Sequence, residues 1–364
     1  MPIHQLYVDA QVADLPITAA FSQRLKLPPN IIEDASILFD MVRNSQDPWG
    51  QGKSIIFLTR NKGAFIKKCP GTRDYTCCGY QILHIGTYCT MDCAYCILQG
   101  YFHPPMLQYF VNHEALMAEL ETKITQPFVQ RMGTGEFTDS LIWEPWSDLT
   151  SRLVERFSRQ DYAVLELKTK TVNIDALKDI KHARKTIVAW SLNTARMIRT
   201  QERGTASLSA RLRAAARCQT WGYPLAFHFD PLVIYPGCED EYFQVLKQLF
   251  SHISADGVVW ISMGTMRFMP ALHSIIQRRF PESDIVFGEF IPGLDGKLRY
   301  FKGLRIKLYR QMLRWIKEFA PQVMVYLCME DEKVWTDCFG FAPQAMGGLA
   351  HMLDESARLH CNLK

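Results

Sequence analysis

The segment from residue 82 to residue 96 reads Ile82-Leu83-His84-Ile85-Gly86-Thr87-Tyr88-Cys89-Thr90-Met91-Asp92-Cys93-Ala94-Tyr95-Cys96. It opens on a short apolar run with β-branched residues, which is typical of a buried strand. The run leads directly into a loop that carries three cysteines with the spacing C-x3-C-x2-C. We therefore predict that a strand delivers three thiols to one end of a sheet.

Similar apolar runs follow this strand and alternate with segments of helical spacing. This alternation predicts a parallel sheet with helical crossovers. We expect an α/β fold built on a partial (β/α)6 barrel, with a doubly wound sheet as the rival. In either fold the chemistry collects at the carboxyl ends of the strands. The further strands are predicted at residues 128–132, 163–167, 186–190, 225–229 and 258–261, and helices at residues 115–124, 149–157, 208–219 and 242–250.

Three regions are expected along the chain. They are an N-terminal α/β extension (residues 1–79), the barrel (residues 80–265) and a C-terminal α/β region (residues 266–364). The extension contains a predicted helix at residues 31–42. The C-terminal region contains a predicted helix at residues 303–319 and a predicted strand at residues 322–327.

The composition is that of an ordinary globular protein, with 48% hydrophobic and 21% charged residues among 364. The net charge of +4 is too small to argue for or against a nucleic-acid partner. We see neither a signal peptide nor a run of about 18 apolar residues, so we expect a cytoplasmic protein with no membrane partner. In that reducing compartment, eleven cysteines favour metal or redox chemistry over a disulfide framework.

Three thiolates on one short loop suit a [4Fe–4S] cluster, which otherwise takes four cysteine ligands. The fourth iron then stays open for a small ligand. A zinc site is the alternative, with its remaining ligand from Cys69, Cys77 or Cys78, because zinc prefers four ligands. The same three upstream cysteines can also hold a second metal or simply pack as small apolar residues.

The cysteine loop resembles that of the spore photoproduct lyase family of radical S-adenosylmethionine (SAM) enzymes. Tyr95 precedes the last cysteine, and Cys96-Ile97-Leu98-Gln99 follows. The resemblance implies a radical SAM partial barrel, a [4Fe–4S] cluster on Cys89, Cys93 and Cys96, and SAM as cofactor. It also implies an electron donor such as flavodoxin or ferredoxin and a thymine dimer in DNA as substrate. It continues at residues 191–194, 204–205, 211–215 and 222–225.

The resemblance also implies a SAM site at the strand ends. Glu136 closes Gly133-Thr134-Gly135-Glu136, which resembles a motif whose carboxylate accepts hydrogen bonds from the SAM ammonium group. Thr138 and Lys170 would contact the SAM carboxylate. Asn193 and Thr194 would contact the ribose hydroxyls. The structural alternatives for these residues are a strand-end turn, a surface lysine and a helix cap.

Two positions depart from the family pattern. Ile97 stands where the repair enzymes carry a second tyrosine, and Glu136 stands where they carry the cysteine that returns hydrogen to the product. The radical-generating half is therefore retained, while the family's quenching route is missing. Cys238, which follows the fifth predicted strand, is the candidate substitute donor and joins Tyr95 as a predicted catalytic residue.

Two further features are candidate substrate contacts. Strand alternation puts His228 and Asp230 on one face, which would face the substrate if it looks into the barrel; a buried, satisfied histidine is the alternative. Residues 297–317 carry eight basic side chains and no acidic one. Four of them form a helical stripe that can track a phosphate backbone or form a solvated face, namely Lys307, Arg310, Arg314 and Lys317.

These patterns predict a radical SAM enzyme that acts on DNA, like a spore photoproduct lyase. One alternative keeps the enzyme and changes the substrate to a peptide or a small molecule. The other is a non-catalytic, metal-bound nucleic-acid module.

Overall fold

A curled, mostly parallel sheet forms the centre of the computed structural model, which describes residues 2–71 and 74–364. Its strand order is β18-β14-β13-β11-β10-β9-β5-β4, and only β4 runs antiparallel to its neighbour. The predicted partial barrel is confirmed, and the strand predicted at residues 322–327 in the C-terminal region joins its sheet as β18. The strands are β4 (Ile66–Lys68), β5 (Gln81–Leu83), β9 (Gln130–Gly133), β10 (Ala163–Thr169), β11 (Thr186–Ser191), β13 (Leu225–Leu232), β14 (Val258–Thr265) and β18 (Met324–Leu327).

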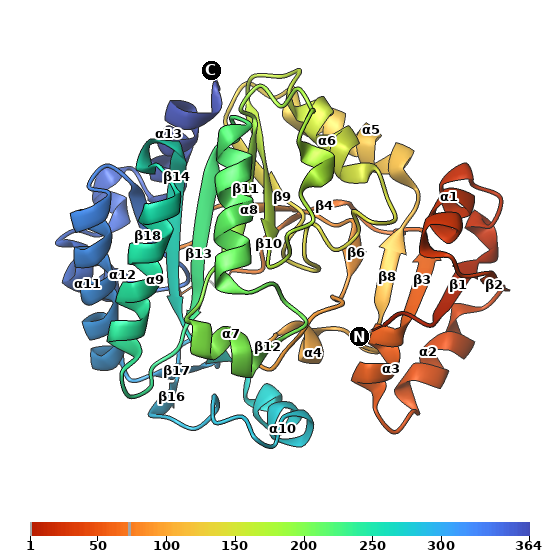
Figure 1. Cartoon of the computed structure of the whole chain (residues 1–364), viewed down its shortest axis with the longest axis horizontal. Helices are drawn as coiled ribbons and strands as arrows, with labels where there is room; N and C mark the ends of the chain where they lie inside the picture. The colour runs from red at the N-terminus through yellow and green to blue at the C-terminus, as the bar shows by residue number, and fades with distance from the viewer. Residues whose placement is uncertain (1, 72–73) are drawn as a thin grey trace.

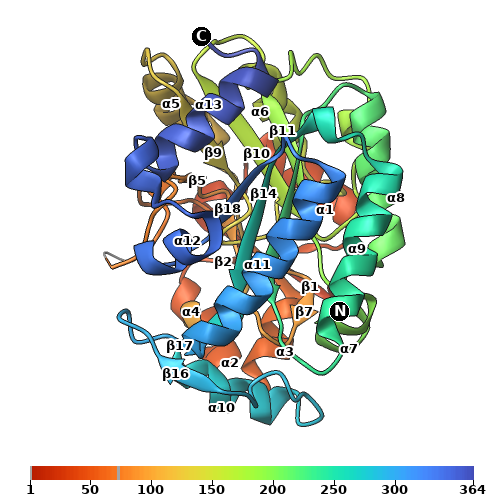
Figure 2. The same ribbon diagram turned by 90° about the vertical axis from the view of Figure 1, so that its left-hand side faces the viewer.

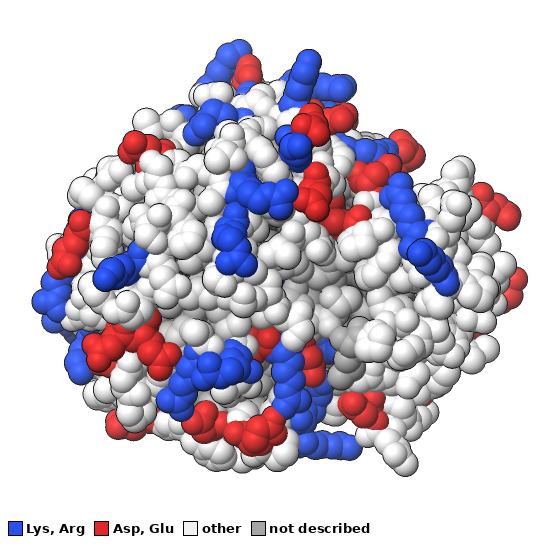
Figure 3. Space-filling view, viewed as in Figure 1, with Lys and Arg blue, Asp and Glu red and all other residues white. Residues whose placement is uncertain are grey.

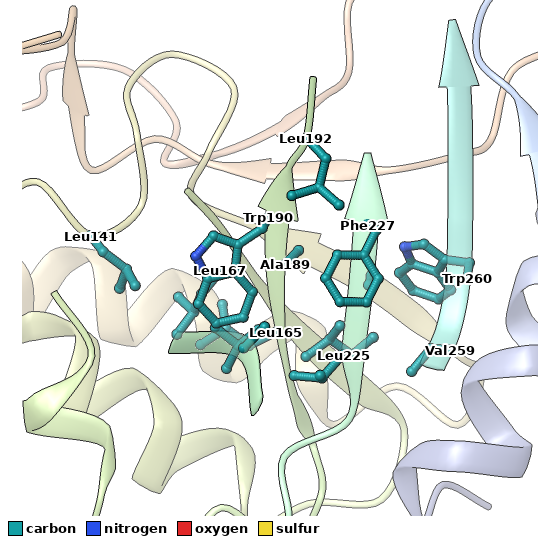
Figure 4. Close-up of a cluster of buried hydrophobic side chains, with 14 of the residues drawn as sticks. Leu141, Leu165, Leu167, Ala189, Trp190, Leu192, Leu225, Phe227, Val259 and Trp260 are labelled. Atoms are coloured by element: carbon teal, nitrogen blue, oxygen red, sulfur yellow. The ribbon is translucent and has the colours of Figure 1, made fainter. Parts of the chain in front are cut away.

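Helices cover the convex face of this sheet (Figures 1 and 2). The strands send apolar side chains into the layer against these helices, and every residue of β14 is buried. Figure 4 shows the layer between sheet and helices, where Leu167, Trp190 and Phe227 pack together. The covering helices are α5 (His113–Ile124), α6 (Leu149–Phe157), α8 (Leu208–Thr220), α9 (Cys238–His252), α11 (Lys302–Phe319), α12 (Glu332–Phe339) and α13 (Leu349–Cys361).

A second sheet forms the N-terminal part, with the order β2-β1-β3-β8-β6. Its strands are β1 (Gln5–Asp9), β2 (Pro29–Ile32), β3 (Ile55–Thr59), β6 (Gly86–Thr87) and β8 (Leu107–Phe110), with α1 (Pro16–Leu25), α2 (Ala35–Arg43) and α3 (Pro48–Ser54) beside them. Strands therefore cross the expected boundary at residue 80 in both directions, because β6 and β8 join this sheet while β4 joins the barrel. The division of the chain into three regions stays a prediction.

The prediction of one helix over residues 31–42 is wrong at its start. Ile31 and Ile32 belong to strand β2, and helix α2 begins only at Ala35. The reason is local, because the Asp34 carboxylate accepts a hydrogen bond of 2.8 Å from the Ser36 amide and so caps the helix there.

A small structure lies across the carboxyl edge of the main sheet (bottom of Figure 2). It consists of α10 (Pro270–Arg279) and the antiparallel strands β15 (Arg267–Phe268), β17 (Leu298–Tyr300) and β16 (Phe290–Pro292). A separate apolar cluster around Phe268, Ile276 and Tyr300 holds it together. Among the described residues, no helix combines the length and hydropathy needed to cross a bilayer.

The core in Figure 4 can be tested with a matched pair of truncations. Leu167 is fully buried, so we expect Leu167→Ala to lower the free energy of unfolding by about 2–5 kcal/mol, because the lost methyl groups leave a cavity. Leu359, which is 81% exposed, should change by less than about 0.5 kcal/mol in Leu359→Ala. Urea denaturation followed by circular dichroism measures both. Equal losses would contradict the described packing.

Candidate functional site

The three cysteines of the loop lie where the two sheets meet. Strand β6 separates β5 from the loop and pairs with β8 of the N-terminal sheet. Inside the loop, β7 (Asp92–Cys93) pairs with β12 (Glu202–Arg203), which follows α7 (Ala195–Gln201) at the barrel edge. The prediction that the loop follows a barrel strand is thus refined. Both sheets hold it.

Buried side chains on both sides of the loop bind its backbone. The Lys53 ammonium group donates hydrogen bonds to the carbonyl oxygens of Cys89 and Met91. On the other side, the Gln99 amide donates to the carbonyl oxygens of Cys93, Ala94 and Cys96 at 2.9–3.3 Å. The loop is therefore preorganised by the protein around it.

The Asp92 carboxylate fixes the centre of the same loop. Arg279 of α10 approaches both of its oxygens at 2.9 and 3.1 Å, and Lys53 lies 3.7 Å away. All three side chains are nearly buried, and the two cations flank the carboxylate. Sequence reasoning missed Lys53 and Arg279, since nothing in their local sequence marks them as neighbours of the loop, and it did not assign Gln99 this role.

The thiols are shielded from solvent and close enough to influence one another. Cys93 is buried, whereas Cys89 and Cys96 are partly exposed. Burial raises the pKa of Cys93 to about 12, and the Lys170 ammonium, 3.7 Å from its sulfur, acts in the opposite direction. Bound metal deprotonates such thiols outright.

A zinc ion and a [4Fe–4S] cluster differ in how close together their protein ligands must lie. Within residues 2–71 and 74–364, no three His, Cys, Asp or Glu side chains are gathered closely enough to hold one metal ion. A [4Fe–4S] cluster does not need such closeness, because each thiolate binds a different iron atom.

A buried charge network joins the loop to the barrel edge. Lys170, at the end of β10, donates to the Tyr95 hydroxyl at 2.7 Å and lies 3.2 Å from the Glu202 carboxylate. The Tyr95 hydroxyl donates to the same carboxylate, and Arg211 of α8 pairs with its other oxygen. Burial, which would raise the pKa of Glu202, is outweighed by Lys170 and Arg211, so that this pKa falls to about 2. The carboxylate is therefore ionised between two cations.

Asp139 is a second carboxylate that sequence reasoning missed. It accepts hydrogen bonds from the amides of Leu141 and Lys170 and from the Thr169 hydroxyl at 2.8–3.0 Å. These contacts link the loop after β9 to the end of β10. They fix the backbone from which Lys170 projects toward the cysteine loop.

The first two predicted SAM contacts lie on the loop after β9. The Glu136 carboxylate pairs with Lys168 of β10, so its charge is already partly balanced by the protein. Thr138 is buried and accepts a hydrogen bond of 3.1 Å from the Trp143 indole. A Cβ on Gly135 would lie 2.9 Å from the Lys168 side chain, which explains the need for glycine in this close approach.

The side chains of Asn193 and Thr194, at the end of β11, form hydrogen bonds within the protein. The Asn193 amide donates to the Pro231 carbonyl at 2.9 Å and accepts from the Tyr242 hydroxyl at 3.0 Å. The Thr194 hydroxyl caps helix α7 and lies 2.6 Å from that of Tyr235. The helix-cap alternative is thus realised for Thr194. Their contacts with a ribose stay predictions.

His228 and Asp230 lie on the concave face of the sheet. Figure 4 shows Leu225 and Phe227 in the layer toward the helices. The residues that alternate with them along β13, His228 and Asp230 among them, therefore point to the opposite face. His228 lies 2.6 Å from both Glu166 and Ser262, and Asp230 binds Arg267 at 2.8 and 3.0 Å.

The interior of the half-barrel therefore carries three acid–base pairs from neighbouring elements. They are Glu136–Lys168, Glu166–His228 and Asp230–Arg267. Burial, which would raise the pKa of Glu166, is outweighed by His228, and this pKa is lowered. The face is therefore polar. Its substrate role remains a prediction.

Cys238 lies away from these pairs, at the start of α9. It is 1% exposed, and its thiol donates toward Glu239 at 3.4 Å. Burial raises the pKa of Cys238 to about 11, so the sulfur stays a protonated thiol. It packs in the apolar core with Tyr242. A role as hydrogen donor stays a prediction that requires the surrounding core to open.

The basic stripe divides into two parts on the outer wall of the half-barrel, where α11 runs (Figure 2). Lys307, Arg310 and Arg314 line a groove of about 660 Å³ beside Asp337 of α12. Lys317 instead donates to the carbonyl oxygens of Pro321 and Val323 at 2.8 and 2.9 Å. Three of the four predicted cations therefore share one groove, and the fourth binds the segment that follows its own helix.

A second groove, of about 630 Å³, borders the cysteine loop from outside. Thr90 and Met91 of the loop line it, together with Trp146, Asn173 and Thr205. Figure 3 shows a hollow on this face with mostly uncharged residues around it and charged side chains further out. Sequence reasoning did not predict this groove, because its walls come from both sheets.

The chain is similar to known proteins over most of its length. A family model described as spore photoproduct lyase matches residues 75–299. The spore photoproduct lyase of a Geobacillus species is 27% identical over 259 residues, which cover 66% of this chain and 74% of that protein. The Bacillus subtilis spore photoproduct lyase is 27% identical over 208 residues, covering 56% and 61%.

Solved structures show the same fold. A spore photoproduct lyase variant superposes with a TM-score of 0.80 at 21% identity, covering 90% of this chain and all of the other. Another variant, solved with bound AdoMet and a dinucleoside spore photoproduct, superposes with a TM-score of 0.78 at 21% identity and the same coverage. At this level of identity the likeness concerns the fold alone.

The anchoring of the cysteine loop can be tested through Lys53. Lys53→Met keeps the length of the side chain but removes two hydrogen bonds from a charged donor, each worth about 1.5–3 kcal/mol. We expect faster amide hydrogen exchange in residues 89–93 and a lower free energy of unfolding. Lys68→Met, at an exposed lysine, is the control and should change neither. Unchanged exchange in the Lys53 variant would mean that the loop is held by other contacts.

Proposed function

The chain belongs to the spore photoproduct lyase family, and from this membership we propose that it is a radical SAM enzyme acting on DNA. Cys89, Cys93 and Cys96 would hold a [4Fe–4S] cluster, with SAM on its open iron. When bound, this cofactor pair supplies a 5′-deoxyadenosyl radical that takes a hydrogen atom from the substrate. The observation that carries the proposal is the preorganised loop, whose Cys93 thiol faces the buried Lys170 ammonium.

The donor set fits such a cluster. Three thiols on a loop of eight residues leave one iron of a cubane without a protein ligand, as a small-molecule ligand requires. Lys170 beside Cys93 offsets part of the negative charge of the thiolates. Because Glu202 and Arg211 are themselves buried, they hold Lys170 and Tyr95 in place without help from solvent.

The residues predicted to contact SAM already have partners within the protein, which limits how each of them can bind the cofactor. Lys170 and Thr138 offer a cation and a hydroxyl near the loop for the SAM carboxylate. Glu136 can still accept from the SAM ammonium, because a carboxylate offers about four acceptor positions and Lys168 occupies only part of them. Asn193 and Thr194 would have to share atoms already engaged in helix and loop contacts.

A second candidate function follows from the ion pair at Glu136. A carboxylate paired with Lys168 cannot return a hydrogen atom as a thiol does, so the family's quenching route is absent at this position. This favours a substrate other than the thymine dimer, such as a peptide or a small molecule, for the same radical chemistry. An external electron donor such as flavodoxin or ferredoxin is proposed for either substrate.

The proposed activity is tested with anaerobically reconstituted protein, SAM, a strong reductant and DNA irradiated in the dry state. We expect brown protein with about four irons per chain, formation of 5′-deoxyadenosine and restored thymine. Cleavage of SAM without restored thymine would support the second candidate. A colourless protein that leaves SAM intact would overturn both.

The same assay identifies the ligands. Each of the single changes Cys89→Ala, Cys93→Ala and Cys96→Ala should abolish visible absorption and SAM cleavage, because no other thiol lies on this loop. Cys338→Ala, at a cysteine of helix α12, is the matched control and should retain both. Iron and cleavage retained in all three loop variants would contradict the cluster assignment.

The outer groove tests for contact with DNA. Changing Lys307, Arg310 and Arg314 together to Gln should weaken binding at low salt and reduce the slope of log affinity against log salt by about 2.7, at about 0.9 per phosphate contact. Lys317→Gln is the control, because this cation already binds carbonyl oxygens of its own chain. Equal slopes in all proteins would make the stripe a solvated face.

A further inference from the structure

The half-barrel is not closed by hydrogen bonding, since β18 and β4 lie at the two opposite edges of its sheet. The segment between β4 and β5 nevertheless reaches the residues that follow β18. The Thr76 amide donates to the Glu330 carbonyl oxygen at 3.0 Å. Figure 2 shows this orange segment beside α12. We call the region between the two edges the seam.

Four cysteines lie on the two segments that border the seam. They are Cys69, Cys77, Cys78 and Cys328, and none belongs to the cysteine loop. Several of these thiols act on one another's pKa. Cys77 contributes to the pKa of Cys69 and of Cys78, Cys328 contributes to that of Cys78, and Cys69 contributes to that of Cys328. Such a group of thiols is a redox site in a reducing compartment if one of them is reactive and exposed.

Cys77 meets both conditions. It is exposed, and its sulfur accepts a hydrogen bond of 3.5 Å from the Gly79 amide. The neighbouring Cys78 thiol also favours its thiolate, and Arg131 of β9 adds a positive charge that Asp354 of α13 partly balances. These contacts, led by the one from Cys78, outweigh burial and lower the pKa of Cys77 to about 5.

Cys69 is the complementary thiol. Burial, aided by the negative charge of Glu136, raises the pKa of Cys69 to about 12, so it keeps its proton. The two residues are neighbours in space, because a Cβ on Gly71 would lie 3.2 Å from the Cys77 sulfur and 3.9 Å from the Cys69 carbonyl oxygen. The Cys77 sulfur thus lies against the turn in which the Gly71 amide donates to the Cys69 carbonyl oxygen at 2.7 Å.

Cys78 is nearer to Cys77 along the chain but is a poor disulfide partner. Adjacent Cα atoms are about 3.8 Å apart, whereas a relaxed disulfide needs about 4.4–6.8 Å. Cys328 lies toward Cys78 and Cys69, where Arg267 donates to its sulfur at 3.5 Å. Cys69 is therefore the resolving thiol that fits Cys77.

We propose that Cys77 and Cys69 form a redox-active thiol pair at the seam, reacting with low-molecular-weight disulfides such as glutathione disulfide. The Cys77 thiolate attacks one sulfur of the disulfide, forms a mixed disulfide and releases one glutathione thiolate. Cys69 then loses its proton, attacks the Cys77 sulfur and releases the second glutathione thiolate. Two protein thiols are oxidised, and one glutathione disulfide is reduced to two thiols.

The pair also touches the interior of the half-barrel. Cys69 lies within the electrostatic reach of Glu136 and Lys168, so converting its thiol to a disulfide changes the surroundings of that ion pair. The redox state of the seam is thereby coupled to the face that carries the candidate substrate contacts. The proposal concerns residues outside the cysteine loop and does not depend on the radical chemistry.

The reactivity of Cys77 is measured first, by anaerobic alkylation of the full-length protein with iodoacetamide and peptide mass spectrometry. At pH 6 we expect Cys77 to react roughly tenfold faster than an ordinary exposed thiol, after allowing for the weaker nucleophilicity of a low-pKa thiolate. Its rate should change little between pH 6 and pH 8. Cys338, whose pKa burial raises to about 12, is the slow internal control. A Cys77 rate that climbs steeply with pH would overturn the proposal.

The disulfide is measured next, after incubation of the same protein with glutathione disulfide. We expect a linked pair of peptides containing Cys69 and Cys77, reversed by a dithiol. Cys69→Ser should stop at a glutathione adduct on Cys77, Cys77→Ser should leave Cys69 reduced, and Cys338→Ser should behave as the parent. Circular dichroism verifies that each variant is folded. A link through Cys78 or Cys328, or no link at all, would overturn the pairing.

Discussion

The buried carboxylate of Glu202 ties the cysteine loop to the carboxyl edge of the parallel sheet. It faces Lys170 from β10 and Arg211 from α8, and it accepts from Tyr95 within the loop itself. Burying an unpaired charge costs several kcal/mol. Displacing any one member of this group would leave another buried charge without its partner, so the members fix one another's positions. Because β12 also pairs with β7, the backbone and the charges enforce the same arrangement.

The concave face of the half-barrel is shaped by strand alternation and by pairs of opposite charges. Strand alternation sends apolar residues such as Phe227 toward the helices and leaves His228 and Asp230 on the inner side. Each inner acidic side chain pairs with a basic one from a neighbouring element. Glu136 is part of this pattern, since it pairs with Lys168. An interior of this kind suits a polar substrate.

The cysteines fall into populations that differ in surroundings rather than in sequence. Those of the loop are anchored through their backbone, and Cys93 lies beside the Lys170 ammonium. Those of the seam differ sharply from each other, because Cys77 receives hydrogen bonds at the surface while Cys69 is buried beside a carboxylate. Cys238 and Cys361 pack in the apolar core. The cysteines of this chain thus lie in three different kinds of surroundings.

The alternating strands and helices, the cysteine spacing and the family could be predicted from the sequence, because strand runs, helical periodicity and short motifs are local properties. The placement of His228 and Asp230 on one face could also be predicted, since alternation is a property of the strand alone. The start of α2 was predicted wrongly, because one capping carboxylate outweighs an apolar run there. The partners of each charge became known only from the folded structure. Lys53, Glu202 and Arg279 lie far along the chain from the loop or strand ends that they bind, and Cys69 meets Glu136 only after the sheet has curled. Electrostatic and hydrogen-bonding partners depend on distance in space, which the order of residues does not encode directly.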